Sequence, residues 1–224
     1  MPAQQDSGDY TTIEQGIVKG RVTDAKGNPL ANTKVVIENT ILYASYVYAY
    51  TDAKGYYKTN VPIGSWTVSV QIKRNFLGTE YLFDLTPDNY NSFAGYTGAV
   101  RNLVWKLSGE KPQGGYYGNN VAVYADILNF MLLTDVELTL TPDGPLADGS
   151  TGQLIKGNLF DIGGGEYGLN DVPLGKYSIT ARNKATNEPL QIRLRNTGNY
   201  GNSITAVFKP LFSSTINQIV LEVN

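Results

Sequence analysis

Tyrosine is the residue type in this sequence whose spacing best fits a binding role. Tyr46, Tyr48 and Tyr50 occupy every second position of one segment, so in a strand their phenol rings share one face. If that face is exposed, the rings form an amphipathic surface on which sugars stack and protein partners anchor. If the face is buried, tyrosine is simply a good strand former. The spacing predicts a shared face and leaves its exposure open.

Tyr116 and Tyr117 form a second candidate binding surface. They lie in the segment SGEKPQGGYYGNN at 108–120, whose glycine content is typical of a linker. Their alternative role is packing between the domains that such a linker joins. The candidate surface therefore comprises Tyr46, Tyr48, Tyr50, Tyr116 and Tyr117.

Catalytic chemistry finds little support in the composition. The chain has no histidine and no cysteine, which removes the commonest general base, the commonest zinc ligand and any thiolate. No serine lies in a Gly-x-Ser-x-Gly elbow, and 20 dispersed acidic residues make chance pairs of carboxylates inevitable. We expect a protein that is not an enzyme and needs no cofactor.

A calcium site built from side-chain oxygen atoms is the remaining kind of site to consider. Asp84, Asp88, Asn89 and Asn91 lie close together in sequence, but they lack the Asp-x-Asp-x-Asp-Gly spacing of a calcium loop. Turn and capping hydrogen bonds are the roles that we expect for them. The triple glycine at 163–165 lacks the Lys-Ser/Thr of a phosphate loop and predicts a hairpin tip.

The elements that must position these side chains come in two copies. The first copy has GYY at 55–57 and VPIGSW at 61–66, and the second has GEY at 165–167 and VPLGKY at 172–177. Pro62 and Pro173 are 173 − 62 = 111 residues apart, the length of one small β-domain. We expect Trp66 and Tyr177 to begin matching strands and to point into the two cores.

Period-two patterns and turn residues predict strands throughout the chain. No segment has the pattern of an amphipathic helix, and the apolar run at 124–133 is either a strand or a single helical turn. The fold class is therefore all-β, with two tandem β-sandwiches. The expected strands are 16–24, 33–38, 42–51, 57–61, 66–72, 81–85, 100–107, 136–141, 166–170, 176–182, 190–194, 203–208 and 218–223.

Four segments follow from this pattern. Residues 1–15 are a polar leader, 16–107 the first sandwich, 108–120 the glycine-rich linker and 121–224 the second, divergent sandwich. The leader lacks the charged-then-apolar layout of a signal peptide. Either the protein is not secreted by that route or a signal has been removed. A leader that is ordered is expected to be held by its own domain or by a neighbour.

Charge and hydropathy argue against two classes of partner, nucleic acids and the membrane interior. The net charge is −2 and no Lys/Arg cluster occurs, so we expect no nucleic-acid binding. No apolar run is long enough to span a bilayer, so we expect no membrane span.

One stretch resembles the carboxypeptidase regulatory-like domain family. Its motifs are GIVKGRVTD at 16–24, GNPLANTKV at 27–35, TDAKGYY at 51–57 and VPIGSWTV at 61–68. The resemblance implies a seven-stranded, prealbumin-like (Ig-like) Greek-key sandwich without catalytic residues. It also implies a module of exported bacterial proteins, often of the Bacteroidetes type. The second half keeps only the Pro-x-Gly-x-Tyr element.

Two functional hypotheses from different classes follow. The first is a non-enzymatic structural or interaction protein, a tandem β-sandwich module of a cell-surface or extracellular assembly, with protein partners or self-association. The alternative is a carbohydrate-binding module that holds a polysaccharide on the tyrosine row. An accessory domain of a hydrolase is a more distant alternative.

Overall fold

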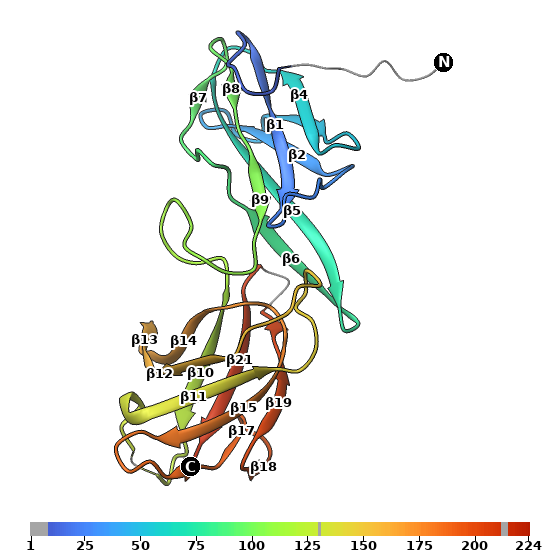
Figure 1. Ribbon diagram of the computed structural model, residues 1–224. Coiled ribbons are helices and arrows are strands. Elements are labelled where there is room, and N and C mark those ends of the chain that lie inside the picture. Colours follow the sequence, from blue (N-terminus) through green and yellow to red (C-terminus); the bar gives the residue numbers. More distant parts are fainter. Residues whose placement is uncertain (1–8, 130, 212–214) are drawn as a thin grey trace. The chain divides into compact units, whose positions relative to one another are not determined.

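The computed structural model describes residues 9–129, 131–211 and 215–224 (Figure 1). Its contacts divide the chain into two compact units. The first contains Met1–Lys73 and Leu82–Lys106, and the second contains Arg74–Tyr81 and Leu107–Asn224. Each unit is built from two β-sheets, and the single helical element of the described residues is the 3₁₀ turn η1 (Leu133–Asp135). The all-β expectation is confirmed.

In the first unit, one sheet has the order β4-β1-β8, and β9 also pairs with β1. The other has the order β3-β2-β5-β6, with β7 pairing with β5; the end of β5 and the start of β6, within Arg74–Tyr81, are counted with the second unit. These strands are β1 (Ile17–Asp24), β2 (Lys34–Asn39), β3 (Tyr46–Tyr50), β4 (Tyr56–Asn60), β5 (Ser65–Phe76), β6 (Thr79–Leu85), β7 (Phe93–Ala94), β8 (Ala99–Val100) and β9 (Leu103–Trp105).

In the second unit, one sheet has the order β13-β14-β10-β21-β17-β18, and β20 also pairs with β21. The other has the order β12-β11-β15-β16, with β19 pairing with β15. These strands are β10 (Asn119–Ala125), β11 (Val136–Pro142), β12 (Ile155–Asn158), β13 (Phe160–Gly163), β14 (Glu166–Val172), β15 (Lys176–Asn183), β16 (Pro189–Leu190), β17 (Ile192–Leu194), β18 (Thr197–Gly201), β19 (Ile204–Val207), β20 (Lys209–Pro210) and β21 (Asn217–Val223).

The two units share a connectivity. In each, the first strand pairs in parallel with the last, β1 with β9 and β10 with β21. In each, it also pairs antiparallel with the strand before the Pro-x-Gly turn, β4 or β14. The sequence repeat is therefore a repeat of fold, two tandem β-sandwiches.

Alternating burial fills the core of each unit. On β1, Val18 and Val22 are fully buried, and on β2, Val35 and Ile37 are fully buried, as the period-two pattern of a half-buried strand predicts. In the second unit, Leu138 and Leu140 of β11, with Ile179 of β15, play the same part.

The turns behave as their sequences predict. Asp24 Oδ1 accepts hydrogen bonds from the amides of Lys26 and Asn28, and Asp52 Oδ1 accepts from Lys54 and Tyr56 in the same way. Gly27 and Gly55 have φ of 83° and 80°, the left-handed conformation that favours glycine. The string TDAKG, which occurs at 23–27 and again at 51–55, thus forms the same turn twice.

Candidate functional site

The tyrosine row lies on an exposed face at the end of a sheet. Tyr46, Tyr48 and Tyr50 belong to β3 and are 42%, 48% and 60% exposed. In the part of the chain that the structure describes, β3 pairs with β2 alone. β3 is therefore an edge strand with one free side.

The backbone of these tyrosines faces the free side. The Thr51 amide donates to the Thr33 carbonyl (3.1 Å) and the Asn39 amide donates to the Ser45 carbonyl (2.9 Å). Because hydrogen-bonded pairs alternate along an antiparallel ladder, the odd-numbered residues of β3 bond to β2. The even-numbered residues, which are the three tyrosines, direct their amide and carbonyl groups outward.

The ring faces of Tyr48 are engaged within the unit. The Lys34 ammonium lies 3.8 Å from the Tyr48 ring centroid, a cation–π contact. The Tyr46 ring lies 6.0 Å from that of Tyr48 with 13° between their planes. A sugar that stacks flat on Tyr48 must displace Lys34. The row thus offers ring edges, hydroxyls and backbone more readily than a flat aromatic surface.

The loop between β2 and β3 extends this exposed surface. Ile41, Leu42 and Tyr43 are 75%, 62% and 100% exposed. Large apolar side chains gathered on one hairpin are typical of an interaction surface. The tyrosine spacing indicated the strand face, but nothing in the sequence joined this loop to it.

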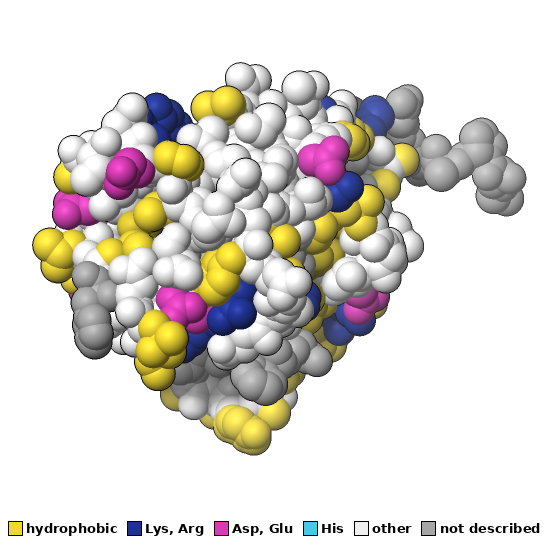
Figure 2. Space-filling model, turned by 90° about the horizontal axis from the view of Figure 1, so that it is seen from below, with side chains coloured by type: hydrophobic (Ala, Val, Ile, Leu, Met, Phe, Trp, Pro, Cys, Tyr) yellow, Lys and Arg dark blue, Asp and Glu magenta, His cyan; other side chains and the backbone are white. Residues whose placement is uncertain are grey.

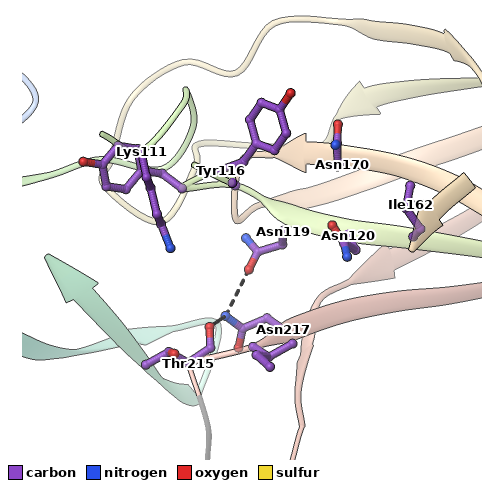
Figure 3. Close-up of a pocket in the computed structure, with 12 residues that line it drawn as sticks. Lys111, Tyr116, Asn119, Asn120, Ile162, Asn170, Thr215 and Asn217 are labelled. Carbon is purple, nitrogen blue, oxygen red and sulfur yellow. Dashed lines mark hydrogen bonds between the residues drawn. The ribbon is translucent and has the colours of Figure 1, made fainter. Parts of the chain in front are cut away.

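Tyr116 and Tyr117 lie in the second unit, at a pocket of about 480 Å³. Tyr116 is exposed and Tyr117 half-buried. Figure 3 shows Tyr116 with Lys111 beside asparagines from three strands, Asn119, Asn120 and Asn170 among them. These asparagines were not predicted from the sequence, because single asparagines in strands and turns carry no distinguishing spacing.

The expected turn role holds for Asp88 and Asn89, whereas Asp84 lies within strand β6. Asp88 Oδ1 accepts from the amides of Asn89 and Asn102, and its Oδ2 accepts from the Asn102 side chain. Asp84 accepts from Gln71. Within the described residues, no group of three or more acidic side chains is placed to hold a metal ion. The triple glycine is the tip between β13 and β14, with positive φ throughout.

The described end of the polar leader contacts its own unit. Glu14 forms ion pairs with Lys19 (3.2 Å) and Lys58 (2.7 Å), and the Tyr10 ring stacks on Tyr56 at 4.4 Å. Residues 1–8 of the predicted leader lie outside the described residues. The described portion therefore gives no support to a leader that acts as a strand between subunits.

Charges are dispersed on the surface. Figure 2 shows Lys and Arg side chains interspersed with Asp and Glu on one face. Among the described residues, no helix is long and apolar enough to cross a membrane.

Comparison with known families supports the resemblance. The sequence model of the carboxypeptidase regulatory-like domain matches residues 17–91, which include β1 to β6. The suspected family is thereby confirmed for this part of the chain. No curated protein matches the chain.

Solved structures that match the chain include a fragment of a pilus adhesin and a major pilin subunit. The Bacillus anthracis TIE protein is 16% identical (TM-score 0.36), covering 93% of this chain and 34% of that protein. A C-terminal fragment of the pilus adhesin SpaC from Lactobacillus rhamnosus GG is 11% identical (TM-score 0.27; coverage 93% and 96%). BcpA, the major pilin subunit of Bacillus cereus, is 9% identical (TM-score 0.26; coverage 94% and 100%).

The chain thus spans about a third of the length of the first of these proteins. With identities this low and TM-scores below 0.5, function must be argued from the residues of the chain itself.

Proposed function

We propose that this chain is a non-enzymatic structural module that self-associates through β3, within a cell-surface or extracellular assembly. The observation that carries the proposal is the free edge of β3. The same three tyrosines supply its exposed side chains and its outward backbone groups. An edge of this kind recruits another strand by main-chain hydrogen bonding.

The absence of the usual protection favours pairing. Natural edge strands are blunted by charged side chains, proline or bulges, and the sequence Tyr-Val-Tyr-Ala-Tyr of β3 has none of these. The equivalent strand of the second unit, β12, pairs with β11 alone among the described strands and carries Lys156. β12 is protected where β3 is not.

A second copy of the chain is the partner that β3 fits best. The order of residue types in β3 is nearly symmetric about Tyr48. An antiparallel pair centred there places Tyr48 opposite Tyr48 of the second copy, and Tyr46 opposite Tyr50. Such a contact is self-complementary, as a two-fold interface requires, and aromatic pairs across strands stabilise it.

The extracellular location rests on the family match. The carboxypeptidase regulatory-like resemblance of residues 17–91 implies an exported protein. Carbohydrate binding by the tyrosine row is less favoured, because Lys34 and Tyr46 already contact the Tyr48 ring.

Sedimentation velocity of the full chain over a range of concentrations tests the proposal. We expect a concentration-dependent dimer that Tyr48→Pro abolishes, because proline removes an outward amide that β2 does not use. Tyr48→Thr keeps that amide and should weaken the dimer less.

Lys156→Pro is the matched control. The Leu159 amide donates to the Val136 carbonyl, so by the same alternation Lys156 directs its amide away from β11. This variant should dimerise like the unmodified chain. A chain that stays monomeric at every concentration, or a Tyr48→Pro dimer of unchanged strength, would contradict the proposal.

A further inference from the structure

The pocket of the second unit is built largely from asparagine amides. It has a volume of about 480 Å³ and is lined from β10, β14, the start of β21 and the loop that precedes β10. Figure 3 shows Asn119, Asn120, Asn170 and Asn217 on these strands, with Lys111 and Tyr116 on the loop. Pockets with a few converging polar groups are typical ligand sites.

A β-bulge in β14 lies beside two consecutive asparagines of β10 that line this pocket. Asn119 pairs with Val172, and Val121 pairs with Leu169. An advance of two residues along β10 therefore corresponds to three residues along β14. Consecutive residues of a regular strand point to opposite faces, yet both Asn119 and Asn120 line the pocket. The extra residue of the bulge lies on β14, next to Asn170. Bulges redirect the side chains of the strand that carries them and are over-represented beside functional sites.

Asn119 and Asn217 form one wall of the pocket, and hydrogen bonds hold both side chains in place. The Asn119 Nδ2 donates to the Val172 carbonyl (3.3 Å), and the Asn217 Nδ2 donates to Asn119 Oδ1 (3.1 Å) and to the Thr215 carbonyl (3.3 Å). Asn217 is 3% exposed, and within the described residues its Oδ1 has no hydrogen-bond partner. Buried amides satisfied only in part are costly, and such departures concentrate at functional sites.

The other two asparagines are available to a ligand. Asn120 and Asn170 are half-buried, and their side-chain amides have no hydrogen-bond partner in the described parts of the chain. Each amide offers two N–H donors and one carbonyl acceptor. This combination suits neighbouring hydroxyl groups, which donate and accept at the same time. Tyr116, 40% exposed at the rim, adds an aromatic ring against which a sugar can pack.

One positive charge lies at this site. Lys111 is the single charged residue among those that line the pocket, and it forms no salt bridge within the described ranges. Its ammonium lies 5.7 Å from the Tyr117 ring centroid. The nearby carboxylate of Asp171 is engaged elsewhere, since it accepts from the amides of Gly109 and Gly118. A ligand with hydroxyls and one negative charge complements this arrangement.

We propose that the pocket binds a sugar residue that carries a carboxylate, a uronic acid of an acidic polysaccharide. Asn120 and Asn170 bind its hydroxyls and Lys111 pairs with its carboxylate. Asn119 and Asn217 hold the wall of the pocket. This site is independent of the β3 edge and belongs to the part of the chain outside the family match.

Isothermal titration calorimetry of the full chain tests this assignment. The ligands are galacturonate, glucuronate and mannuronate trisaccharides, each compared with its neutral counterpart. We expect at least one acidic trisaccharide to bind about tenfold more tightly than its neutral form at low salt, with a difference that shrinks as salt rises.

Substitutions test which side chains bind the carboxylate and which bind the hydroxyls. Lys111→Gln should reduce acidic binding to the neutral level, and the double variant Asn120→Ala/Asn170→Ala should abolish binding of both forms. Lys184→Gln and Asn199→Ala, exposed residues of the same unit outside the pocket, should bind like the unmodified chain. Tyr48→Pro should also bind normally, which separates this site from the dimer.

Three results would overturn the assignment. They are no heat with any of the acidic trisaccharides, equal affinity for acidic and neutral forms, or binding that survives in a folded Asn120→Ala/Asn170→Ala variant.

Discussion

The Trp66 indole donates a hydrogen bond to the Pro62 carbonyl at 2.9 Å. In the second unit the Tyr177 hydroxyl donates to the Pro173 carbonyl at the same distance. The aromatic residue of each Pro-x-Gly-x-aromatic motif thus closes its own turn, with both rings buried as expected. A Cβ on Gly64 would lie 2.8 Å from Asn39 Nδ2 and 3.1 Å from Trp66 Nε1. One on Gly175 would lie 2.7 Å from Leu146 Cδ2 and 3.2 Å from the Tyr177 ring, so the aromatic ring and one further side chain crowd each glycine.

Removing the hydroxyl of this motif should destabilise the second unit. Tyr177→Phe keeps the buried ring and leaves the Pro173 carbonyl without its donor, which costs about 1–2 kcal/mol. Urea unfolding measures the loss. Tyr46→Phe, at an exposed ring, is the control and should change stability by less than about 0.5 kcal/mol. Equal effects of the two variants would contradict the role of the hydrogen bond.

The same residue predicts alkaline sensitivity. Burial raises the pKa of Tyr177 to about 12, above the ordinary value of 10.0. The unfolded chain therefore loses this proton first, so the stabilisation is complete below pH 10 and is lost as the pH rises toward 12. Melting temperatures between pH 9 and 12 should fall less steeply in Tyr177→Phe. Parallel curves would refute this assignment.

Glu14 predicts acid sensitivity in the first unit. Hydrogen bonds from Lys58 and Lys19 lower the pKa of the Glu14 carboxyl below its ordinary value of 4.5. Its stabilisation is therefore present above pH 4.5 and lost as the pH falls through the lower, folded-state pKa. Glu14→Gln should lower the melting temperature at pH 7, because the buried Lys19 ammonium loses its partner. Below pH 4.5 the melting temperature of this variant should also fall less steeply with pH than that of the unmodified chain. An unchanged pH dependence would count against the ion pairs of Glu14.

Asp171 should control the loop that carries Tyr116. Its carboxylate binds the amides of Gly109 and Gly118, and its φ is 56°. Asp171→Gly removes the carboxylate without backbone strain, so hydrogen exchange at those two amides should quicken by about tenfold or more. Asn196→Gly, at another left-handed residue (φ 55°), should leave both amides unchanged. Slow exchange retained in Asp171→Gly would show that the loop is held by other contacts.

Sequence patterns predicted most of the long strands, but they missed the seven-residue β10, whose start lies in the predicted linker, and they failed for several short strands. β2, β11 and β21 alternate clearly, and residue types alone place them. β13 (FDIG) and β18 (TGNYG) carry no alternation, and β20 contains Pro210. Such strands exist because distant partners pair with them, which a local pattern does not record.

The candidate sites could also be predicted only in part. The spacing of Tyr46, Tyr48 and Tyr50 predicts a common face, but exposure depends on whether another element covers it. The asparagine pocket could not be predicted, because it depends on a bulge in β14 and on the pairing of β10 with β21. The boundaries 16–107, 108–120 and 121–224 stay a prediction.

Cysteine crosslinking tests the central claim, self-association through β3, most directly. The chain has no cysteine, so Tyr48→Cys introduces a single thiol. Antiparallel pairing centred on residue 48 brings the two copies of this thiol directly opposite, with Cα atoms about 5.5 Å apart, which a disulfide can span. Tyr46→Cys places the two thiols four residues apart, roughly 14 Å, and should not crosslink.

We therefore expect oxidation to convert Tyr48→Cys into a covalent dimer and to leave Tyr46→Cys monomeric. Tyr43→Cys, fully exposed in the neighbouring loop, reports random collisions. Crosslinking of Tyr48→Cys no faster than that of Tyr43→Cys would contradict the proposed β3 pairing.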